Sequence, residues 1–533
     1  MPHQLQVPPE LLEPENASLL TGILRGVERE SLRVTPTGNL AVSPHPERLG
    51  AALTHPQITT DFSEALLEFI TPPCHSIDDL LNNLSLLQRF TAQQLEHGER
   101  LWTQSMPCAL GEDDSIPVAQ YGKSNNGRMK TVYRVGLGHR YGRAMQTVAG
   151  VHYNFSLPNA FWAFLRHRDN SILNLQAYKD RAYFGLIRNF RRYYWLLIYL
   201  FGSSPAICRS FVRDRPHDLE FMDELSHTLH APYGTSLRMG DLGYQSSAQE
   251  DLYVCYNDKN SYINSLCRAI TQEHKAYADI GTTDEAGNYR QLNTGLLQIE
   301  NEFYSSIRPK RAAKPGETAL SALDNRGVEY IEVRCLDVST DSVLGITDEQ
   351  IRFLDVFLIF CALMPSPDTH KAEAEAIMHN QKRVVRRGRE PGLKLRRTVN
   401  EEVELKTWGL ELLEQFESVA TALDTANGCT LFSESLHNQA KKLEDPSLTP
   451  SARLLEELKS NKLNYARYAL ELSERHHQQL LNNPPTSAEE KRLVQMRQQS
   501  IEEQRALEAP DQQPFAEFLE RYYGQYTMCK NRC

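Results

Sequence analysis

The sequence lacks the short motifs that mark several large enzyme classes. It has no Gly-x-x-x-x-Gly-Lys-[Ser/Thr] loop and no Gly-x-Ser-x-Gly nucleophile elbow. The glycine-rich segment 136–142 does not have the spacing of the dinucleotide-binding fingerprint. Ten cysteines are scattered singly, with no Cys-x-x-Cys pair and no zinc-ligand spacing. These absences argue against a P-loop or Rossmann-type nucleotide site, a serine hydrolase of that type and a zinc centre.

Long hydrophobic runs and excess positive charge are also missing. The longest dense apolar stretch, 193–201, is too short to span a bilayer, and the first residues lack the pattern of a signal peptide. A formal net charge of -10 argues against general affinity for nucleic acid or an anionic membrane. We therefore expect a soluble, cytoplasmic protein with mostly buried, reduced cysteines. Cys529 and Cys533 lie in a polar tail, and nothing in the sequence demands a disulfide between them.

Four segments interrupt strand-like apolar runs with charged residues: 26–33, 60–71, 150–156 and 329–336. Side chains alternate between the faces of a strand, so Glu28 and Glu30 share one face, as do Glu332 and Arg334. In the third segment, His152 and Asn154 share a face opposite Val151, Tyr153 and Phe155. The pattern predicts a sheet with one apolar face and one face rich in carboxylates. Closely spaced carboxylates repel one another, and divalent cations relieve that repulsion.

The order of predicted elements favours an α+β fold built on an antiparallel sheet, because strands and helices do not alternate regularly. Helical spacing is present at 77–100, 159–200 and 347–363. The polar, glycine-rich stretch 110–143 predicts ordered loops near a ligand, and 296–304 reads as a strand. Beyond about residue 400 the chain becomes amphipathic helix, including a predicted helix at 452–481. We expect a catalytic core at 1–398 and a helical region at 399–533 packed on it.

The charged residues of the four segments are candidate ligands for a hard cation. They comprise five carboxylates and one imidazole, a set that suits Mg²⁺ or Mn²⁺: Glu28, Glu30, Asp61, Glu68, Glu332 and His152. Arg334 would place a fork of donors beside the metals, as suits a transferring phosphoryl group. Each residue could instead belong to a structural ion pair; Glu30, for example, could pair with Arg33 or Arg25.

A basic run at 382–397 raises the alternative of a nucleic-acid or acidic partner. No aromatic residue interleaves it, which disfavours stacking on single strands. A solvated loop or an edge facing ATP explains it better.

The segments with charged strands, and others along the chain, resemble the bacterial glutamate–cysteine ligases (γ-glutamylcysteine synthetases). The similarity covers most of the chain from about residue 20 and is carried by 25–33, 53–55, 58–72, 105–108, 119–122, 150–158, 201–208, 235–238, 242–244, 297–302, 307–311 and 328–334. It implies a fold related to the glutamine synthetase catalytic domain, with an antiparallel sheet curved into a funnel for ATP and metals. It also implies ATP-dependent joining of the L-glutamate γ-carboxylate to the L-cysteine amine through γ-glutamyl phosphate, the first step of glutathione biosynthesis.

The resemblance also implies roles for individual residues. The six metal candidates resemble the family's Mg²⁺ ligands, with Mn²⁺ as an alternative ion. Arg334 resembles the arginine on the transferred phosphoryl group, Arg134 lies where it would touch glutamate or phosphate, and Arg238 resembles a substrate-carboxylate binder. A further set resembles the lining of the cysteine pocket: Phe62, Tyr133, Leu137, Gln146, Tyr244 and Tyr304. Tyr133 and Leu137 could instead be ordinary core residues.

Two stretches depart from the family, after residue 365 and after residue 480, and neither is expected to touch the chemistry. Feedback inhibition by glutathione is implied by the family alone. A γ-glutamyl ligase with another amine acceptor is the alternative within the class. A non-catalytic phosphate- or nucleic-acid-binding protein is the alternative outside it.

Overall fold

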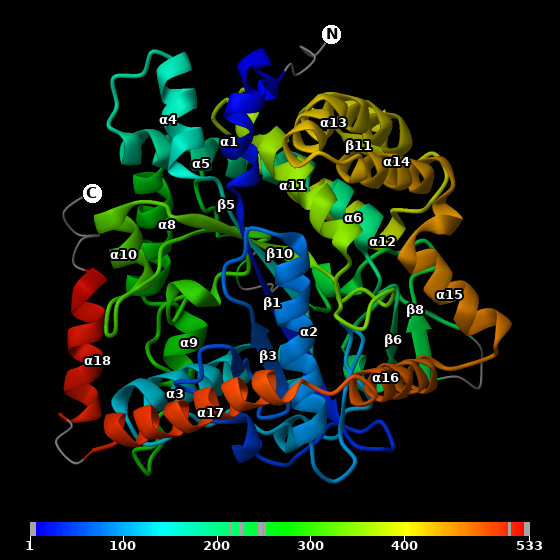
Figure 1. The fold of residues 1–533 in the computed structure, drawn as a ribbon. Helices are drawn as coiled ribbons and strands as arrows, with labels where there is room; N and C mark the ends of the chain where they lie inside the picture. Colours follow the sequence, from blue (N-terminus) through cyan, green and yellow to red (C-terminus); the bar gives the residue numbers. More distant parts are fainter. Residues whose placement is uncertain are drawn as a thin grey trace.

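The computed structural model describes residues 7–213, 215–222, 227–243, 249, 252–509 and 513–526 (Figure 1). Its α-helices are α1 (Ala17–Thr21), α2 (Ile77–Gln94), α3 (Asn125–Tyr141), α4 (Asn159–Arg168), α5 (Leu175–Tyr193), α6 (Trp195–Phe201), α7 (Arg209–Val212), α8 (Lys259–Thr271), α9 (Lys275–Ile280), α10 (Ala319–Arg326), α11 (Asp348–Leu363), α12 (Lys371–Arg387), α13 (Leu405–Asn427), α14 (Leu431–Glu444), α15 (Pro450–Ser460), α16 (Tyr465–Leu481), α17 (Ser487–Leu507) and α18 (Phe515–Gly524). Its strands are β1 (Leu24–Val34), β2 (Ile58–Thr60), β3 (Leu66–Ile70), β4 (Arg100–Leu101), β5 (Val151–Ser156), β6 (Ala206–Cys208), β7 (Glu220–Phe221), β8 (Thr228–His230), β9 (Ile307–Lys310), β10 (Tyr330–Leu336), β11 (Lys394–Arg396) and β12 (Glu402–Glu404).

The main sheet is antiparallel, with strand order β2-β3-β1-β5-β10-β9 and with β4 paired to β1. β1 is eleven residues long and lies between β3 and β5. A mixed α+β architecture with an antiparallel sheet is therefore confirmed.

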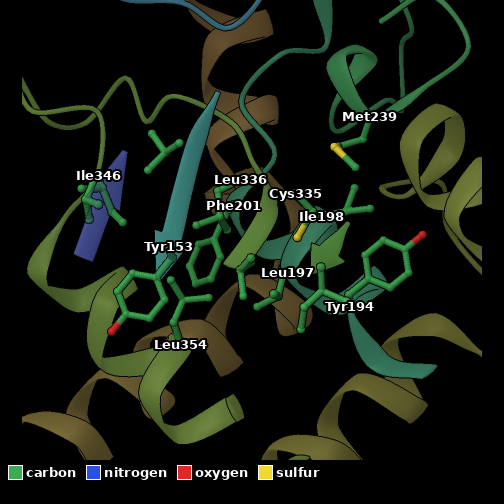
Figure 2. Close-up of a cluster of buried hydrophobic side chains, with 14 of the residues drawn as sticks. Tyr153, Tyr194, Leu197, Ile198, Phe201, Met239, Cys335, Leu336, Ile346 and Leu354 are labelled. Carbon is green, nitrogen blue, oxygen red and sulfur yellow. The ribbon is translucent and has the colours of Figure 1, made fainter. Parts of the chain in front are cut away.

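One face of this sheet is packed against helices. Tyr153 of β5 and Cys335 of β10 lie in a buried apolar cluster with side chains of α6 and α11, including Phe201 and Leu354 (Figure 2). Helix α11 is tied to the same face because the Tyr153 hydroxyl donates a hydrogen bond to Asp355 Oδ1 over 2.7 Å. The apolar alternation predicted for β5 and β10 is thus used for core packing, which leaves the charged alternation on the other face.

Three local expectations are wrong. Half of the predicted loop at 110–143 is helix α3, which begins where Ser124 Oγ accepts a hydrogen bond from Gly127 N. Its glycines serve close packing: a Cβ at Gly127 would lie 2.2 Å from Tyr121 O, and one at Gly136 would lie 2.2 Å from Gln298 Oε1. The predicted strand at 296–304 contains the 3₁₀ turn η8 (Glu300–Glu302) instead.

The third error is the single helix expected at 452–481. The chain forms α15 and α16, separated at 461–464, where Lys462 adopts φ 51° and Asn464 caps α16 by accepting from Arg467 N. Asparagine side chains compete with the helical backbone in this way and favour helix starts.

Helices α13 to α18 pack on the rest of the chain, and their buried side chains join the same core cluster. A hairpin of β11 and β12 spans residues 394–404, across the expected boundary at 398. The division into a core at 1–398 and a helical region at 399–533 stays a prediction. Within the described ranges, no helix is both long and apolar enough to cross a membrane.

Candidate active site

The strand register brings the charged side chains of distant segments together. Glu30 of β1 lies opposite Glu68 of β3, and Glu28 lies opposite His152 of β5. Glu332 of β10 lies opposite Asn154. Because adjacent strands are only about 4.8 Å apart, this register forces carboxylates into one cluster.

His152 lies at the centre of this cluster. Its Nδ1 is 3.3 Å from Glu28 Oε2 and 3.6 Å from Glu332 Oε1, and its Nε2 is 3.7 Å from Glu30 Oε1. Two groups have ligand atoms within 4.8 Å of one another, Glu28–His152–Glu332 and Glu30–Glu68–His152. Asp61 lines the same cavity but belongs to neither group.

Burial and mutual repulsion set the protonation of these acids. Burial raises the pKa of Glu68 well above its usual value, and Glu28 and Asp61 raise it further. Burial also opposes ionisation of Glu332, but Arg334 and Lys310 outweigh it and hold the pKa of that carboxyl well below its usual range. Glu68 therefore lies among other acids that raise its pKa, whereas Glu332 has cationic partners that lower its pKa.

The cluster fits a divalent cation by its donor types and by its incomplete hydrogen bonding. His152 Nε2 and Glu332 Oε2 are buried and have no hydrogen-bond partner in the described part of the chain. Buried polar atoms without partners are rare and point to an absent ion or water. Carboxylate oxygens with one imidazole are donors that Mg²⁺ and Mn²⁺ accept.

The ion pairs proposed as alternatives for Glu30 do not form. Arg33 Nη1 pairs with Glu99 Oε2 at 2.5 Å, and Arg25 pairs with Asp355. Glu30 Oε2 instead accepts a hydrogen bond from Gly150 N over 2.6 Å. Its carboxylate thus stays with the acidic cluster.

Cationic side chains from β9 and β10 flank the acids. Arg334 Nη1 is 2.8 Å from Glu332 Oε1, and Lys310 Nζ is 3.5 Å from Glu332 Oε2. The pairing of β10 with β5 shifts register between Val333 and Leu336, where Arg334 lies. Such irregularities redirect side chains near active sites.

Arg238 enters the site from the 3₁₀ turn η6 (Leu237–Met239), and its side chain is buried. Its Nη2 donates to Arg334 O over 3.0 Å. A Cβ on Gly150 would lie 2.0 Å from Arg238 Nη2, so the guanidinium requires glycine there. The turn is fixed by Ser236 Oγ, which donates to buried Asp337 over 2.8 Å.

Helix α3 contributes Tyr133, Arg134 and Leu137 to the lining of the cavity. The Arg134 Nε donates to Asp61 O, and its guanidinium stacks 4.5 Å from the Tyr121 ring centroid. Arg134 is thereby held beside the acidic cluster.

Residues expected to line a cysteine pocket lie near the C-terminal half of α3 in the same cavity. Phe62 is buried there, and Gln146 Nε2 donates to the Tyr304 hydroxyl over 2.9 Å. Tyr244 lies outside the described residues.

All the other residues predicted for the site line one cavity of about 360 Å³. The cavity also contains residues to which the sequence assigned no role: Met129, Lys130, Met145, Val148, Ile299, Asn301, Arg308, Lys310 and Tyr522. Alternation in 307–310 could have indicated Arg308 and Lys310, since both follow the strand period. Burial lowers the pKa of Lys130 to about 8, with Arg134 adding to the effect.

The basic run at 382–397 is largely occupied by local partners. Arg386 contacts Asp218 and Asp241, Arg383 contacts Glu402, and Arg397 contacts Glu411. As far as the described residues go, none of the run lines the acidic cavity. Its expected position as an edge facing ATP is therefore not supported by this cavity.

A cluster of carboxylates that can hold a cation, flanked by arginine and lysine, is the class of site in which phosphoryl-transfer enzymes hold a nucleotide. A family model described as glutamate-cysteine ligase matches residues 9–384. The chain belongs to the glutamate–cysteine ligase family.

Individual relatives agree over nearly the whole length. The glutamate–cysteine ligase of Saccharophagus degradans is 58% identical over 97% of this chain and 98% of its own. That of Alcanivorax borkumensis is 48% identical over 96% and 98%. A crystal structure of the Francisella tularensis glutamate–cysteine ligase in complex with AMP has a TM-score of 0.89 and 38% identity, covering 95% of this chain and 98% of that one.

Proposed function

We infer that this chain catalyses the ATP-dependent ligation of L-glutamate to L-cysteine, the first step of glutathione biosynthesis. Membership of the family supports the reaction. The observation that carries the assignment to this cavity is the strand register, which gathers Glu28, Glu30, Glu68 and Glu332 around His152.

We propose that Glu28, Glu30, Asp61, Glu68, His152 and Glu332 would hold Mg²⁺, with Mn²⁺ as an alternative, and that the ion would supply positive charge to the phosphate groups of ATP. Arg334 is positioned to donate its guanidinium hydrogens to the transferred γ-phosphoryl group. Lys310 and Arg308 extend this cationic edge for the rest of the polyphosphate.

Arg238 supplies two parallel donors for the glutamate α-carboxylate, because a planar guanidinium can bind both oxygens of a carboxylate. Glutamate held in this way directs its γ-carboxylate at the γ-phosphorus, so that ADP leaves and γ-glutamyl phosphate forms. Arg134 lies where it touches the incoming glutamate or the phosphoryl group. Charge neutralisation and alignment suffice, because no protein nucleophile takes part.

The second half-reaction uses the pocket at the C-terminal end of α3. Cysteine binds with its side chain against Phe62, Leu137 and Tyr133, and the Gln146–Tyr304 pair supplies polar contacts. Its amine attacks the acyl carbon and releases phosphate. The cysteine-binding role expected of Tyr244 from the sequence stays part of our proposal.

Several finer properties remain part of this proposal. They are the funnel-like curvature of a sheet related to glutamine synthetase, a cytoplasmic location and feedback inhibition by glutathione.

Measuring ADP release with ATP, Mg²⁺ and glutamate, with and without cysteine, tests the function. Strong dependence on cysteine, with γ-glutamylcysteine in the products, is the expected result. Better stimulation by another amine would keep the mechanism and change the acceptor. No release from folded protein with either Mg²⁺ or Mn²⁺ would refute the proposal.

A further inference from the structure

The C-terminal helix α18 reaches the cavity, although the family model ends at residue 384. Tyr522 of α18 is 9% exposed and lies among the cavity-lining residues. Figure 1 shows α18 at the left edge of the molecule, on the opposite side from α15 and β8. The tail beyond residue 480, which was not expected to contribute to the site, therefore supplies one side chain to the cavity lining.

Helix α18 is anchored directly to the chain segment that lines the cavity. The Tyr526 hydroxyl donates to Glu300 Oε2 over 2.5 Å, and the Tyr523 hydroxyl donates to Gln298 O over 2.8 Å. On the other side, Thr318 N donates to Gln525 Oε1 over 3.0 Å. Tyr522 packs edge-to-face on Tyr523 and Tyr526, with ring centroids 5.7 and 6.3 Å away. These contacts together hold this part of the chain beside the cavity, so the loss of one hydroxyl bond is not expected to displace the Tyr522 ring.

The cavity lining includes apolar side chains besides those of the proposed cysteine pocket. We treat Met129, Ile299 and Tyr522 as a second apolar group. Met129 and Leu137 are eight residues apart on one helix, which corresponds to about 12 Å along the helix axis. Met129 therefore lies well away from Leu137, and no ligand has yet been assigned to the second group.

Cationic side chains line the same cavity as this second group. Lys130 follows Met129, and both line the cavity. Arg308 Nη2 donates to Asn301 O over 2.8 Å, and Arg308 lies opposite Glu332 in the sheet. A ligand bound across this end needs an anionic part beside the cations and a flat apolar part beside the Tyr522 ring. Aromatic side chains provide stacking surfaces for nucleobases.

We propose that α18 forms one side of the nucleotide end of the site and that Tyr522 packs against the purine base of ATP. The inference rests on the proposed function, since it takes the substrate to be ATP. It makes a helix outside the matched family region part of the substrate-binding machinery.

The test compares binding of ADP with binding of inorganic tripolyphosphate, which lacks the base, to the full-length protein in Mg²⁺ by calorimetry. Tyr522→Ala is expected to weaken ADP about tenfold and tripolyphosphate less than about twofold, because only the stacking contact is lost. Tyr522→Phe is expected to bind both as the wild type does. In turnover, KM for ATP rises while KM for glutamate and cysteine stays constant.

Tyr526→Phe is the matched control, because it removes the hydroxyl bond to Glu300 without altering the cavity lining. It is expected to lower the melting temperature and to leave ADP binding unchanged. Tyr522→Leu, which retains more volume, replaces the alanine variant if that one does not fold, and it is also expected to weaken ADP selectively.

Unchanged ADP binding in the Tyr522 variants, equal losses of ADP and tripolyphosphate, or an equal ADP loss in Tyr526→Phe would overturn the inference. Binding is measured without turnover, so its outcome is separate from that of the proposed function. A wild-type protein that forms no γ-glutamylcysteine refutes the function, whereas an active one with base-independent binding refutes only the role of Tyr522.

Discussion

Both faces of the main sheet bury charged groups, but the partners of these charged groups differ between the two faces. On the helix-packed face, Arg25 Nε donates to Asp355 Oδ2 over 2.8 Å, while the Tyr153 hydroxyl occupies Oδ1. On the cavity face, four glutamates share His152 and a few cationic neighbours, and Glu332 Oε2 has no hydrogen-bond partner among the residues described. Asp355 and Glu332 are both almost inaccessible, at 0% and 1% exposure. Burial alone therefore does not separate them.

The two faces differ in how many carboxylates lie close together and in how many partners each carboxylate has. A buried charge with full hydrogen bonding is compatible with a purely structural role, although such pairs contribute little net stability. The acids near Glu68 raise its pKa, and an added cation would relieve that repulsion. The clustering of several carboxylates around one imidazole on the cavity face, against a single arginine–aspartate pair at Asp355, thus distinguishes the two faces.

Glu332→Gln tests the cavity face most severely. The change keeps the side-chain volume and removes one ligand charge, so kcat is expected to fall at least about a thousandfold, since metal ions supply several kcal/mol of transition-state stabilisation. Thermal unfolding should show an intact fold, and the stabilisation of the protein by Mg²⁺ should shrink. Near-wild-type kcat would remove Glu332 from the metal set.

Asp355→Asn makes the converse test on the helix-packed face. It leaves Arg25 buried without its counter-charge, which is expected to reduce the free energy of unfolding by about 3 kcal/mol. The matched control Tyr153→Phe removes only a hydroxyl and should cost about 1 kcal/mol. Denaturant unfolding measures both. If Asp355→Asn instead abolished kcat in stable protein, the comparison between the faces would fail.

Arg334→Lys keeps the charge and removes the planar fork of donors. We expect kcat to fall about a hundredfold, as when one preorganised donor is lost from a transition state. KM for glutamate should change much less, because Arg238 holds the α-carboxylate in our proposal. Arg352→Lys, at a helical ion pair with Asp348, serves as the neutral control. Survival of kcat in Arg334→Lys would refute the phosphoryl role.

Gly150→Ala perturbs the site without touching a charge. The new Cβ would lie 2.0 Å from Arg238 Nη2, so the guanidinium must move. KM for glutamate is expected to rise about tenfold, which corresponds to about 1.4 kcal/mol. Gly26→Ala on β1 is the control, because its Cβ would lie 3.4 Å from Asn154 Cβ. Equal behaviour of the two variants would dissociate Gly150 from Arg238.

Sequence reasoning succeeded where the strand period alone decides which side chains share a face. Glu28 with Glu30, and Glu332 with Arg334, follow from alternation, and the antiparallel sheet then places them in register. The expectation is wrong at α3, because glycines indicate loops in a sequence, whereas Gly127 and Gly136 allow close packing of a helix. The close packing can be recognised only from the tertiary structure, which shows Tyr121 and Gln298 against these glycines.

Tyr522 illustrates a second limit. It is about 390 residues from Met129 in the sequence, yet both line the same cavity. Nothing in the local pattern of α18 distinguishes Tyr522 from Tyr523 or Tyr526, which anchor the helix instead. Such a residue is found only from the tertiary structure, because its role depends on where the helix packs and not on the spacing of residues along the helix.

The smallest effect concerns pH, and Glu68→Gln isolates it. Burial and the neighbouring acids raise the pKa of Glu68 in the folded protein above its unfolded value of about 4.5. The protonated form therefore contributes stability that is fully present below about pH 4.5 and is lost as pH rises through the higher folded pKa. In EDTA, the melting temperature of the wild type is expected to fall relative to that of Glu68→Gln as pH increases through this window.

Comparing the two proteins is necessary because other members of the cluster contribute to the same curve. The pKa of Glu30 is also raised, chiefly by burial, whereas that of Glu332 is lowered by Arg334 and Lys310 despite its burial, so their contributions have opposite signs. The difference between wild type and Glu68→Gln removes the part common to both proteins. If the melting temperatures of the two proteins changed in parallel from acid to alkaline pH, the pKa of Glu68 would be the same in the folded and unfolded metal-free protein. In that case the cavity face would resemble the helix-packed face more closely than its geometry indicates.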